Sequence, residues 1–259
     1  MKTPSSPGRT ETINGMRMYY EIHGQGEPLL LLHGFTGAGS DWEPFISRLP
    51  AEYQLVIPDM RGHGRSTNPS LEFTHRQSAL DVFGLLDLLS IEKFKAIGVS
   101  CGGNTLLHMA TQQPCRVEAM VLVSATAYFP QQARAIMRQF TVDNMTAEEW
   151  QLMRQRHKHG DDQIRALWSQ GNGFKDSYLD MNFTPPYLST ITARTLIVNG
   201  DRDPFYPVNI PVEMRAAIPN SYLWIVPNGG HGPIGGDVKD HFIDTASRFL
   251  RGEWGSRRG

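Results

Sequence analysis

One run of this chain has the residue types that acyl transfer by a serine requires. Ser100 stands at the centre of Gly98-Val99-Ser100-Cys101-Gly102, between a strand-like apolar segment at 94–99 and a helix-like segment that begins near Gly103. A serine on such a sharp strand-to-helix turn has its hydroxyl pushed out of the sheet, and the flanking glycines remove clashing side chains. We therefore predict that Ser100 is a nucleophile. The alternative interpretation is a glycine-rich turn with no catalytic role.

Ser100 needs a base, because a serine hydroxyl is almost never ionised at neutral pH. Among the nine histidines, His231 has the best position, since it lies in a glycine-rich loop at 228–233, just after the last predicted strand. Loops at this carboxyl edge carry the ligands of open α/β sheets. We predict that His231 is the general base.

The other histidines downstream of Ser100 have simpler interpretations. His108 and His241 fall within predicted helices, so we expect packing or surface roles for them. His157 and His159 stand in a polar segment with no Cys or carboxylate at zinc-ligand spacing. We expect these two rings to be exposed to solvent, and we expect no metal site.

The base in turn needs an acid that orients its ring. Asp201 and Asp203 are the candidates, in Gly200-Asp201-Arg202-Asp203-Pro204 directly after a predicted strand. Asp203 is favoured because Pro204 biases it toward an extended backbone and stiffens the turn. Asp201 is then expected to cap the turn or to pair with Arg202.

Two backbone amides are expected to stabilise the oxyanion of a tetrahedral intermediate. The Cys101 amide lies at a predicted helix N-terminus, and the Phe35 amide lies in the turn after the apolar run at 28–33. His33 is expected to hold this turn by hydrogen bonds. The Cys101 thiol could be a second nucleophile or a redox sensor, but a small buried hydrophobe is the favoured interpretation.

Alternating strands and helices must position these residues. An Asn14-Gly15 pair within 12–22 predicts an antiparallel hairpin at the start of the sheet. Apolar runs that alternate with helical patterns then predict a mostly parallel α/β sheet. The runs are 28–33, 53–58, 94–99, 119–123, 194–198 and 222–226, and the later helical patterns are 104–112, 211–217 and 238–250.

Two further helices are expected from capping boxes. One box is Ser40 to Glu43, and the other is Thr74 to Gln77. In the second helix, one apolar face is predicted to cover the sheet. Its residues are Leu80, Phe83, Leu86 and Leu89.

The alternation stops between 127 and 193, where helical stretches at 134–140, 148–157 and 163–169 have no strand between them. We predict a helical cap at 127–193, inserted into an α/β core formed by 1–126 and 194–259. Basic and acidic residues are equal in number in the cap, so it offers no strong field to a charged substrate.

Many aromatic and methionine side chains of the cap could line an apolar acyl pocket, although packing is the expected role of most. Trp42, which follows the oxyanion turn, could border the site or simply be buried. The cap candidates are Phe129, Met137, Phe140, Met145, Trp150, Met153, Trp168, Phe174, Met181, Phe183 and Tyr187.

The composition of the 259 residues excludes several partner classes. With 25 Lys and Arg against 26 Asp and Glu, the net charge of −1 favours neither nucleic acid nor an anionic membrane. The leucine run at 29–32 is too short to span a bilayer, and 1–9 has no apolar signal region. Cys101 and Cys115 are expected at opposite ends of a helix, too far apart for a disulfide. We expect a cytoplasmic protein with a small-molecule partner and no cofactor; its oligomeric state is not predicted.

Five motifs make the chain resemble the α/β-hydrolase superfamily from about residue 12 to residue 250. The resemblance implies an eight-stranded, mostly parallel sheet with an antiparallel second strand. It also implies Ser100 as nucleophile, Asp203 as acid, His231 as base, and the Phe35 and Cys101 amides as oxyanion donors. The motifs are HGFTG at 33–37, DMRGHGRS at 59–66, GVSCGG at 98–103, GDRDPFYP at 200–207 and GGHGP at 229–233.

Departures from related patterns narrow the expected activity. Similar dehalogenases and epoxide hydrolases have an aspartate nucleophile, whereas position 100 is serine. Similar proline iminopeptidases usually have tryptophan after the serine and a larger acidic cap. Cys101 replaces a methionine or glutamine more usual in the superfamily, which affects the pocket shape rather than the mechanism.

The leading functional prediction is a cofactor-free serine carboxylesterase for small to medium, largely apolar esters. A lactonase, a carbon–carbon bond hydrolase and a perhydrolase use nearly the same residues and remain alternatives. From other classes, a ligand receptor that signals through cap movement and an inactive scaffold also remain.

Overall fold

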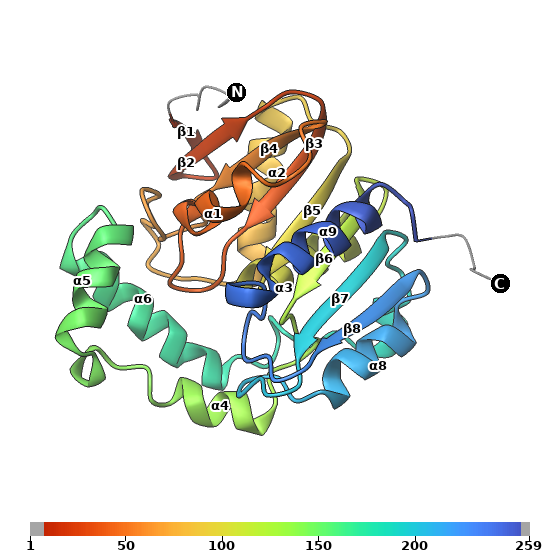
Figure 1. Cartoon of the computed structure of the whole chain (residues 1–259). Helices are drawn as coiled ribbons and strands as arrows, with labels where there is room; N and C mark the ends of the chain where they lie inside the picture. The colour runs from red at the N-terminus through yellow and green to blue at the C-terminus, as the bar shows by residue number, and fades with distance from the viewer. Residues whose placement is uncertain (1–7, 255–259) are drawn as a thin grey trace.

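The structure, a computed structural model that describes residues 8–254, is built on one eight-stranded sheet (Figure 1). The strand order is β1-β2-β4-β3-β5-β6-β7-β8. Pairs that involve β2 are antiparallel and the other pairs are parallel, which confirms the predicted fold class. The strands are β1 (Arg9–Ile13), β2 (Met16–His23), β3 (Glu27–Leu32), β4 (Tyr53–Pro58), β5 (Phe94–Val99), β6 (Val117–Val123), β7 (Arg194–Gly200) and β8 (Ser221–Val226).

The predicted hairpin at Asn14 and Gly15 is confirmed. Both residues have positive φ angles, 46° and 77°, and they connect β1 to β2. Asparagine and glycine tolerate this left-handed backbone better than other residues, so this turn holds the two strands in register. Residues 1–7, most of the polar N-terminal stretch considered above, lie outside the described residues.

Helices cover both faces of the sheet (Figure 1). In β3, Leu30 and Leu32 face one hydrophobic core, and Leu29 and Leu31 face a second core on the other side of the sheet. A strand buried on both faces reads as a continuous apolar run, as this one does. The first face is covered by α2 (His75–Leu88), α3 (Cys101–Gln112) and α8 (Asn209–Ala217), and the second by α1 (Glu43–Ile46) and α9 (Lys239–Leu250).

The two predicted capping boxes have different outcomes. At Thr74 half of the box forms: Thr74 is the N-cap of α2 and its hydroxyl accepts from the Gln77 amide at 3.0 Å, but the Gln77 side chain donates to Asp81 Oδ1 instead of bonding the Thr74 amide. The box at Ser40 is wrong, because the Asp41 carboxylate accepts from the Ala38 amide and a 3₁₀ turn, η1 (Gly39–Trp42), precedes α1.

The predicted apolar face of α2 is only partly correct. Phe83 and Leu86 are buried, Leu89 is half-buried, and Leu80 is 40% exposed. Leu80 is replaced on the buried face by Ala79 and Val82. The buried face of α2 is therefore rotated by about one residue from the face that the leucine spacing predicts.

Between β6 and β7 the regular elements are helices joined by loops, with one isolated bridge between Tyr128 and Asn182. Figure 1 shows α4, α5 and α6 as an arc along one end of the sheet. All three predicted helical stretches lie within or overlap these helices. The elements are α4 (Gln131–Met137), η2 (Val142–Asn144), α5 (Ala147–Arg156), α6 (Asp161–Gly173), η3 (Phe174–Asp176) and α7 (Pro185–Leu188). The division into core and cap domains stays a prediction.

Three smaller expectations concern the whole chain. Cys101 is buried, Cys115 is exposed, and both are free thiols, as predicted. Trp42 is buried and its ring packs against Phe45 at 5.5 Å, which agrees with a packing role. None of the helices within residues 8–254 has both the length and the apolar character that a membrane crossing requires.

Candidate active site

Ser100 lies on the turn between β5 and α3 with a strained backbone. Its φ and ψ are 51° and −111°, a conformation that a residue with a side chain rarely adopts. The Ser100 amide donates to the Val123 carbonyl of the neighbouring strand at 2.7 Å. Both glycines of the turn are required, since a Cβ on Gly98 or Gly102 would lie 2.6 or 2.4 Å from backbone atoms. The turn therefore presents the hydroxyl at the carboxyl edge of the sheet.

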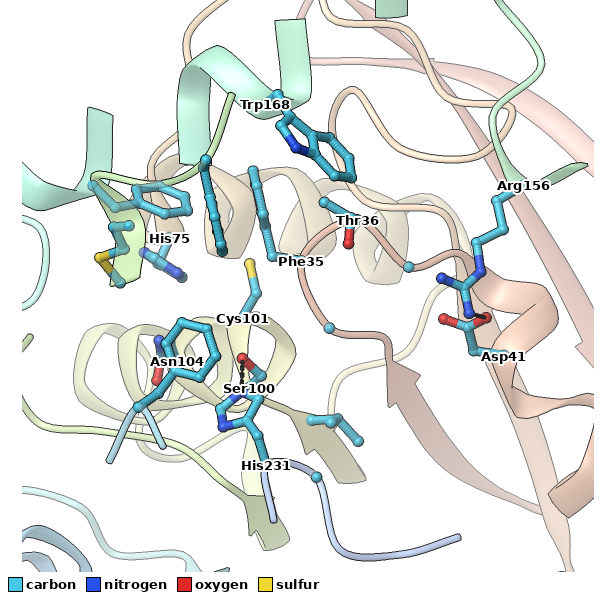
Figure 2. A pocket seen from close by; sticks show the side chains of 18 of the residues that line it. Phe35, Thr36, Asp41, His75, Ser100, Cys101, Asn104, Arg156, Trp168 and His231 are labelled. Atoms are coloured by element: carbon cyan, nitrogen blue, oxygen red, sulfur yellow. Dashed lines mark hydrogen bonds and ion pairs between the residues drawn. The ribbon is translucent and has the colours of Figure 1, made fainter. Parts of the chain in front are cut away.

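Loops after β7 and β8 bring Asp203 and His231 to this hydroxyl. The Ser100 Oγ and the His231 Nε2 are 2.8 Å apart, as Figure 2 shows by a dashed line. The His231 Nδ1 lies 2.8 and 3.0 Å from the two carboxylate oxygens of Asp203. The structure thus joins the three sequence-predicted side chains in one hydrogen-bonded series.

Asp203 is held as a buried carboxylate. Its Oδ1 also accepts from the amides of Phe205 at 2.8 Å and Tyr206 at 3.1 Å. Burial raises the pKa of Asp203, but the hydrogen bond and charge of His231 and the two amides together hold it below its ordinary value. Asp201, by contrast, is exposed and lies 3.9 Å from Arg202, so it takes no part in the series.

The two residues whose amides are predicted to stabilise the oxyanion both line the cavity that contains Ser100. Phe35 lies in a turn closed by a bond from the Gly37 amide to the Gly34 carbonyl at 3.1 Å. His33 anchors this turn: its Nδ1 donates to Gly34 O at 2.7 Å and its Nε2 accepts from the Met60 amide at 3.0 Å. Within residues 8–254, neither the Phe35 amide nor the Cys101 amide donates to another residue.

Ser100 opens into a cavity of about 660 Å³. Six of the suggested cap side chains line it, whereas Met145, Trp150, Met181, Phe183 and Tyr187 do not. These six are Phe129, Met137, Phe140, Met153, Trp168 and Phe174. The Cys101 side chain also lines the cavity, and burial, with the nearby Asp180 carboxylate, raises the pKa of its thiol. A thiol that stays protonated agrees with the small-hydrophobe interpretation.

The expectation of solvent exposure at His157 is wrong, although His159 is exposed as expected. His157 is 2% exposed; its Nδ1 accepts from the Gly64 amide at 2.9 Å and its Nε2 lies 3.1 Å from the Thr36 carbonyl oxygen. Burial lowers the pKa of His157 to about 4, so the ring is neutral at neutral pH. It connects the end of α5 to the turn that carries Phe35.

Several cavity residues were missed by sequence reasoning. Arg156 and Asp41 form an ion pair of 3.0 Å on one side of the Ser100 hydroxyl, and His75 and Asn104 lie on the other (Figure 2). None of these four residues lies in one of the five sequence motifs, and only the fold brings them to one cavity. A helix N-cap at Thr74 could have indicated that His75 starts a helix, but not where its ring points.

Within residues 8–254, no group of three or more His, Cys, Asp and Glu side chains could hold a metal ion.

Known proteins are similar to this chain in fold and, at 20–29% identity, in sequence. A protein-family model described as alpha/beta hydrolase fold matches residues 27–156. A 2-hydroxy-6-oxononadienedioate/2-hydroxy-6-oxononatrienedioate hydrolase of Pseudomonas putida is 29% identical over 83% of this chain and 85% of its own. The human serine hydrolase BPHL is 27% identical over 92% of this chain and 84% of its own. A solved structure of a meta-cleavage product hydrolase from Pseudomonas fluorescens is similar in fold, with a TM-score of 0.78 and 20% sequence identity. The match covers 95% of this chain and 98% of that one.

Proposed function

The chain belongs to the alpha/beta-hydrolase fold family, and within it we propose that this protein is a serine carboxylesterase for small to medium, largely apolar esters. Ser100 is the nucleophile, His231 the general base and Asp203 the orienting acid. The observation that carries the proposal is the unbroken series of hydrogen bonds from Ser100 through His231 to a buried carboxylate, at the floor of a cavity.

In the first half-reaction, the Ser100 Oγ attacks the ester carbonyl carbon and its proton passes to His231 Nε2. The carbonyl π electrons move onto the oxygen, where the Phe35 and Cys101 amides stabilise the charge. The bond to the alcohol oxygen then breaks, and the leaving alkoxide takes the proton from His231. The products of this step are the free alcohol and an acyl group on Ser100.

In the second half-reaction, water attacks the acyl carbon while His231 takes one of its protons. Collapse of the second tetrahedral intermediate returns that proton to the Ser100 Oγ and releases the acid. Asp203 accepts from His231 Nδ1 throughout, so the ring keeps the tautomer that presents Nε2 to Ser100 and its transient positive charge is stabilised.

The apolar lining of the cavity supports a preference for esters with apolar acyl groups. Phe129, Met137 and Phe174 line the same cavity as Ser100. Burying an apolar chain against such side chains contributes about 25 cal/mol per Å² of surface removed from water. We propose that residues 127–193 act as a cap that sets this preference. We also propose a cytoplasmic location, which the two free thiols support.

Ester turnover with and without the nucleophile tests the proposal. Wild-type protein is expected to hydrolyse p-nitrophenyl butyrate and to be labelled by a fluorophosphonate probe. Ser100→Ala should lose the labelling and reduce kcat by about 10³-fold or more. Equal turnover by the two proteins would refute the proposal, and labelling without turnover of any substrate would instead favour the receptor alternative.

Carbon–carbon bond hydrolysis is the second candidate. The relative from Pseudomonas putida is named for that type of substrate and covers 83% of this chain. A panel of butyrate esters, lactones and 2-hydroxy-6-oxo-dienoates separates the candidates. The carboxylesterase proposal predicts the highest kcat/KM for an ester, and a higher value for a dienoate would assign the second activity.

A further inference from the structure

His75 is a second histidine that faces the cavity, and the mechanism above does not use it. Its side chain is 1% exposed, and it lines the cavity at the N-terminus of α2. The Nδ1 lies 2.6 Å from Asp180 Oδ2. The ring also packs against Phe129 and Phe174, with centroid distances of 5.8 and 5.2 Å. An imidazole is thus fixed between two aromatic side chains in the cavity wall.

Asp180 determines which ring nitrogen of His75 is available. Its carboxylate accepts from the ring and from the amides of His75 at 2.8 Å and Arg76 at 3.0 Å. Burial raises the pKa of Asp180, but these hydrogen bonds, above all the one from the His75 ring, outweigh it and hold the pKa of Asp180 at about 2. In the uncharged ring the proton therefore lies on Nδ1, and Nε2 is a hydrogen-bond acceptor. Asp180 is outside the cavity lining, so the Nε2 edge is the one turned to the cavity.

Asn104 is a second polar side chain that lines the cavity. Its Oδ1 accepts from the Thr126 amide at 2.9 Å, and its buried Nδ2 lies near the Tyr206 hydroxyl. Burial raises the pKa of Tyr206, and hydrogen bonding to Asn104 acts against this rise. Cys101, Asn104 and His108 share one face of α3, and the His108 Nε2 lies 2.7 Å from the Asp180 carbonyl oxygen. This face is therefore turned toward the segment that holds His75. Figure 2 shows the His75 and Asn104 side chains on the side of Ser100 opposite the Arg156–Asp41 pair.

We propose that this end of the cavity is a subsite for a hydroxyl group on the acyl part of the substrate. His75 Nε2 accepts the hydroxyl proton. A hydroxyl can donate to this nitrogen, whereas a carbonyl or ether oxygen can only accept. The inference rests on the proposed ester hydrolysis and names its preferred substrates as hydroxyacyl esters.

The physical reason for a preference is the cost of buried polar groups without partners. A plain alkyl chain at this position would exclude water from His75 Nε2 and leave this nitrogen unpaired. Sites that hydrogen-bond a substrate hydroxyl reject the analogue without it more strongly than apolar pockets reject an added hydroxyl. Selection is therefore expected against the unsubstituted acyl group.

Matched pairs of methyl esters test the subsite. Each pair consists of an unbranched acyl chain of about six to ten carbons and the same chain with a terminal hydroxyl, and the readout is the ratio of the two kcat/KM values. Wild-type protein is expected to favour the hydroxyacyl ester at one chain length. His75→Phe keeps an aromatic ring without the acceptor, and the ratio should fall about tenfold.

His108→Phe is the matched control, because His108 also contacts Asp180 but does not line the cavity. It should keep the wild-type ratio. An equal fall in both variants, or no fall in His75→Phe, would overturn the subsite. No preference in the wild-type protein at any chain length would also overturn it, even if His75→Phe did not fold.

Failure of the subsite and failure of the esterase proposal give different results. If esters are turned over and Ser100→Ala abolishes that turnover, but the ratio does not depend on His75, only the subsite is wrong. If turnover of both esters survives Ser100→Ala, the proposed function itself is wrong.

Discussion

The turn at Ser100 has no room for a side chain on its glycines. A Cβ on Gly102 would lie 2.4 Å from the carbonyl oxygen of Leu32, and a Cβ on Gly98 would lie 2.6 Å from the backbone of Gly102. Backbone atoms of a central strand cannot move aside as a flexible side chain can. The strained φ of Ser100 is therefore held in place by close packing of β3, β5 and α3.

Gly102→Ala is expected to destabilise the protein by at least about 2 kcal/mol and to lower kcat, because the turn must shift to accept the methyl group. Chemical denaturation measures the first effect and ester turnover the second. Gly173→Ala is the control, since a Cβ there meets nothing within 4 Å and Gly173 ends a helix. Equal stability of the two variants would contradict this account of the turn.

His157 connects residues 127–193 to the loops that follow β3 and β4. Through its two ring nitrogens it links Gly64 and Thr36, and Thr36 follows the proposed oxyanion donor Phe35. Thr36 itself has a φ of 61°, which few residues with a side chain adopt. Residues 127–193, the predicted cap, thus contribute to the position of the turn that carries Phe35 as well as to the wall of the cavity.

Replacing His157 by Phe is expected to lower kcat for p-nitrophenyl butyrate about tenfold with a smaller change in KM, because the Phe35 amide loses its position. The control is His159→Phe in the same segment, where the ring is exposed and makes one hydrogen bond to the Arg65 carbonyl. Steady-state kinetics of both variants give the comparison. An unchanged kcat in His157→Phe would show that the cap does not position this turn.

The sequence predicts the elements best where burial is uniform. β4 and β5 match the predicted ranges 53–58 and 94–99 at both ends, because strands buried on both faces are continuous apolar runs. Prediction fails where contacts with residues distant in the sequence decide whether a side chain is buried. His157 has polar neighbours in the sequence, yet Gly64 and Thr36 satisfy its ring and bury it. For the same reason, His75 and Asn104 carry no local signal.

The whole molecule buries several histidines that lie outside the proposed triad. Burial lowers the pKa of His33, His63, His108 and His157, to about 4 for the last two. In the unfolded chain a histidine takes up its proton near its ordinary pKa of about 6.5. Each ring therefore stabilises the folded state fully above pH 6.5, and that stability is lost as the pH falls toward 4.

The free energy of unfolding is accordingly expected to decrease between about pH 7 and about pH 4.5, by up to about 3 kcal/mol for each such histidine. Burial raises the pKa of Asp59, which acts in the opposite direction for one group. Urea denaturation at the two pH values measures the change, and His108→Gln should reduce it. A constant or rising stability toward pH 4.5 would contradict the burial of neutral rings.

Capture of the acyl-enzyme tests the central claim most directly. Wild-type protein is mixed with p-nitrophenyl butyrate, quenched in acid during turnover, digested and analysed by mass spectrometry. The proposed mechanism predicts one butyryl group on the peptide that contains Ser100, and none in Ser100→Ala. Turnover with a butyryl group on another residue, or undiminished turnover by Ser100→Ala, would contradict it.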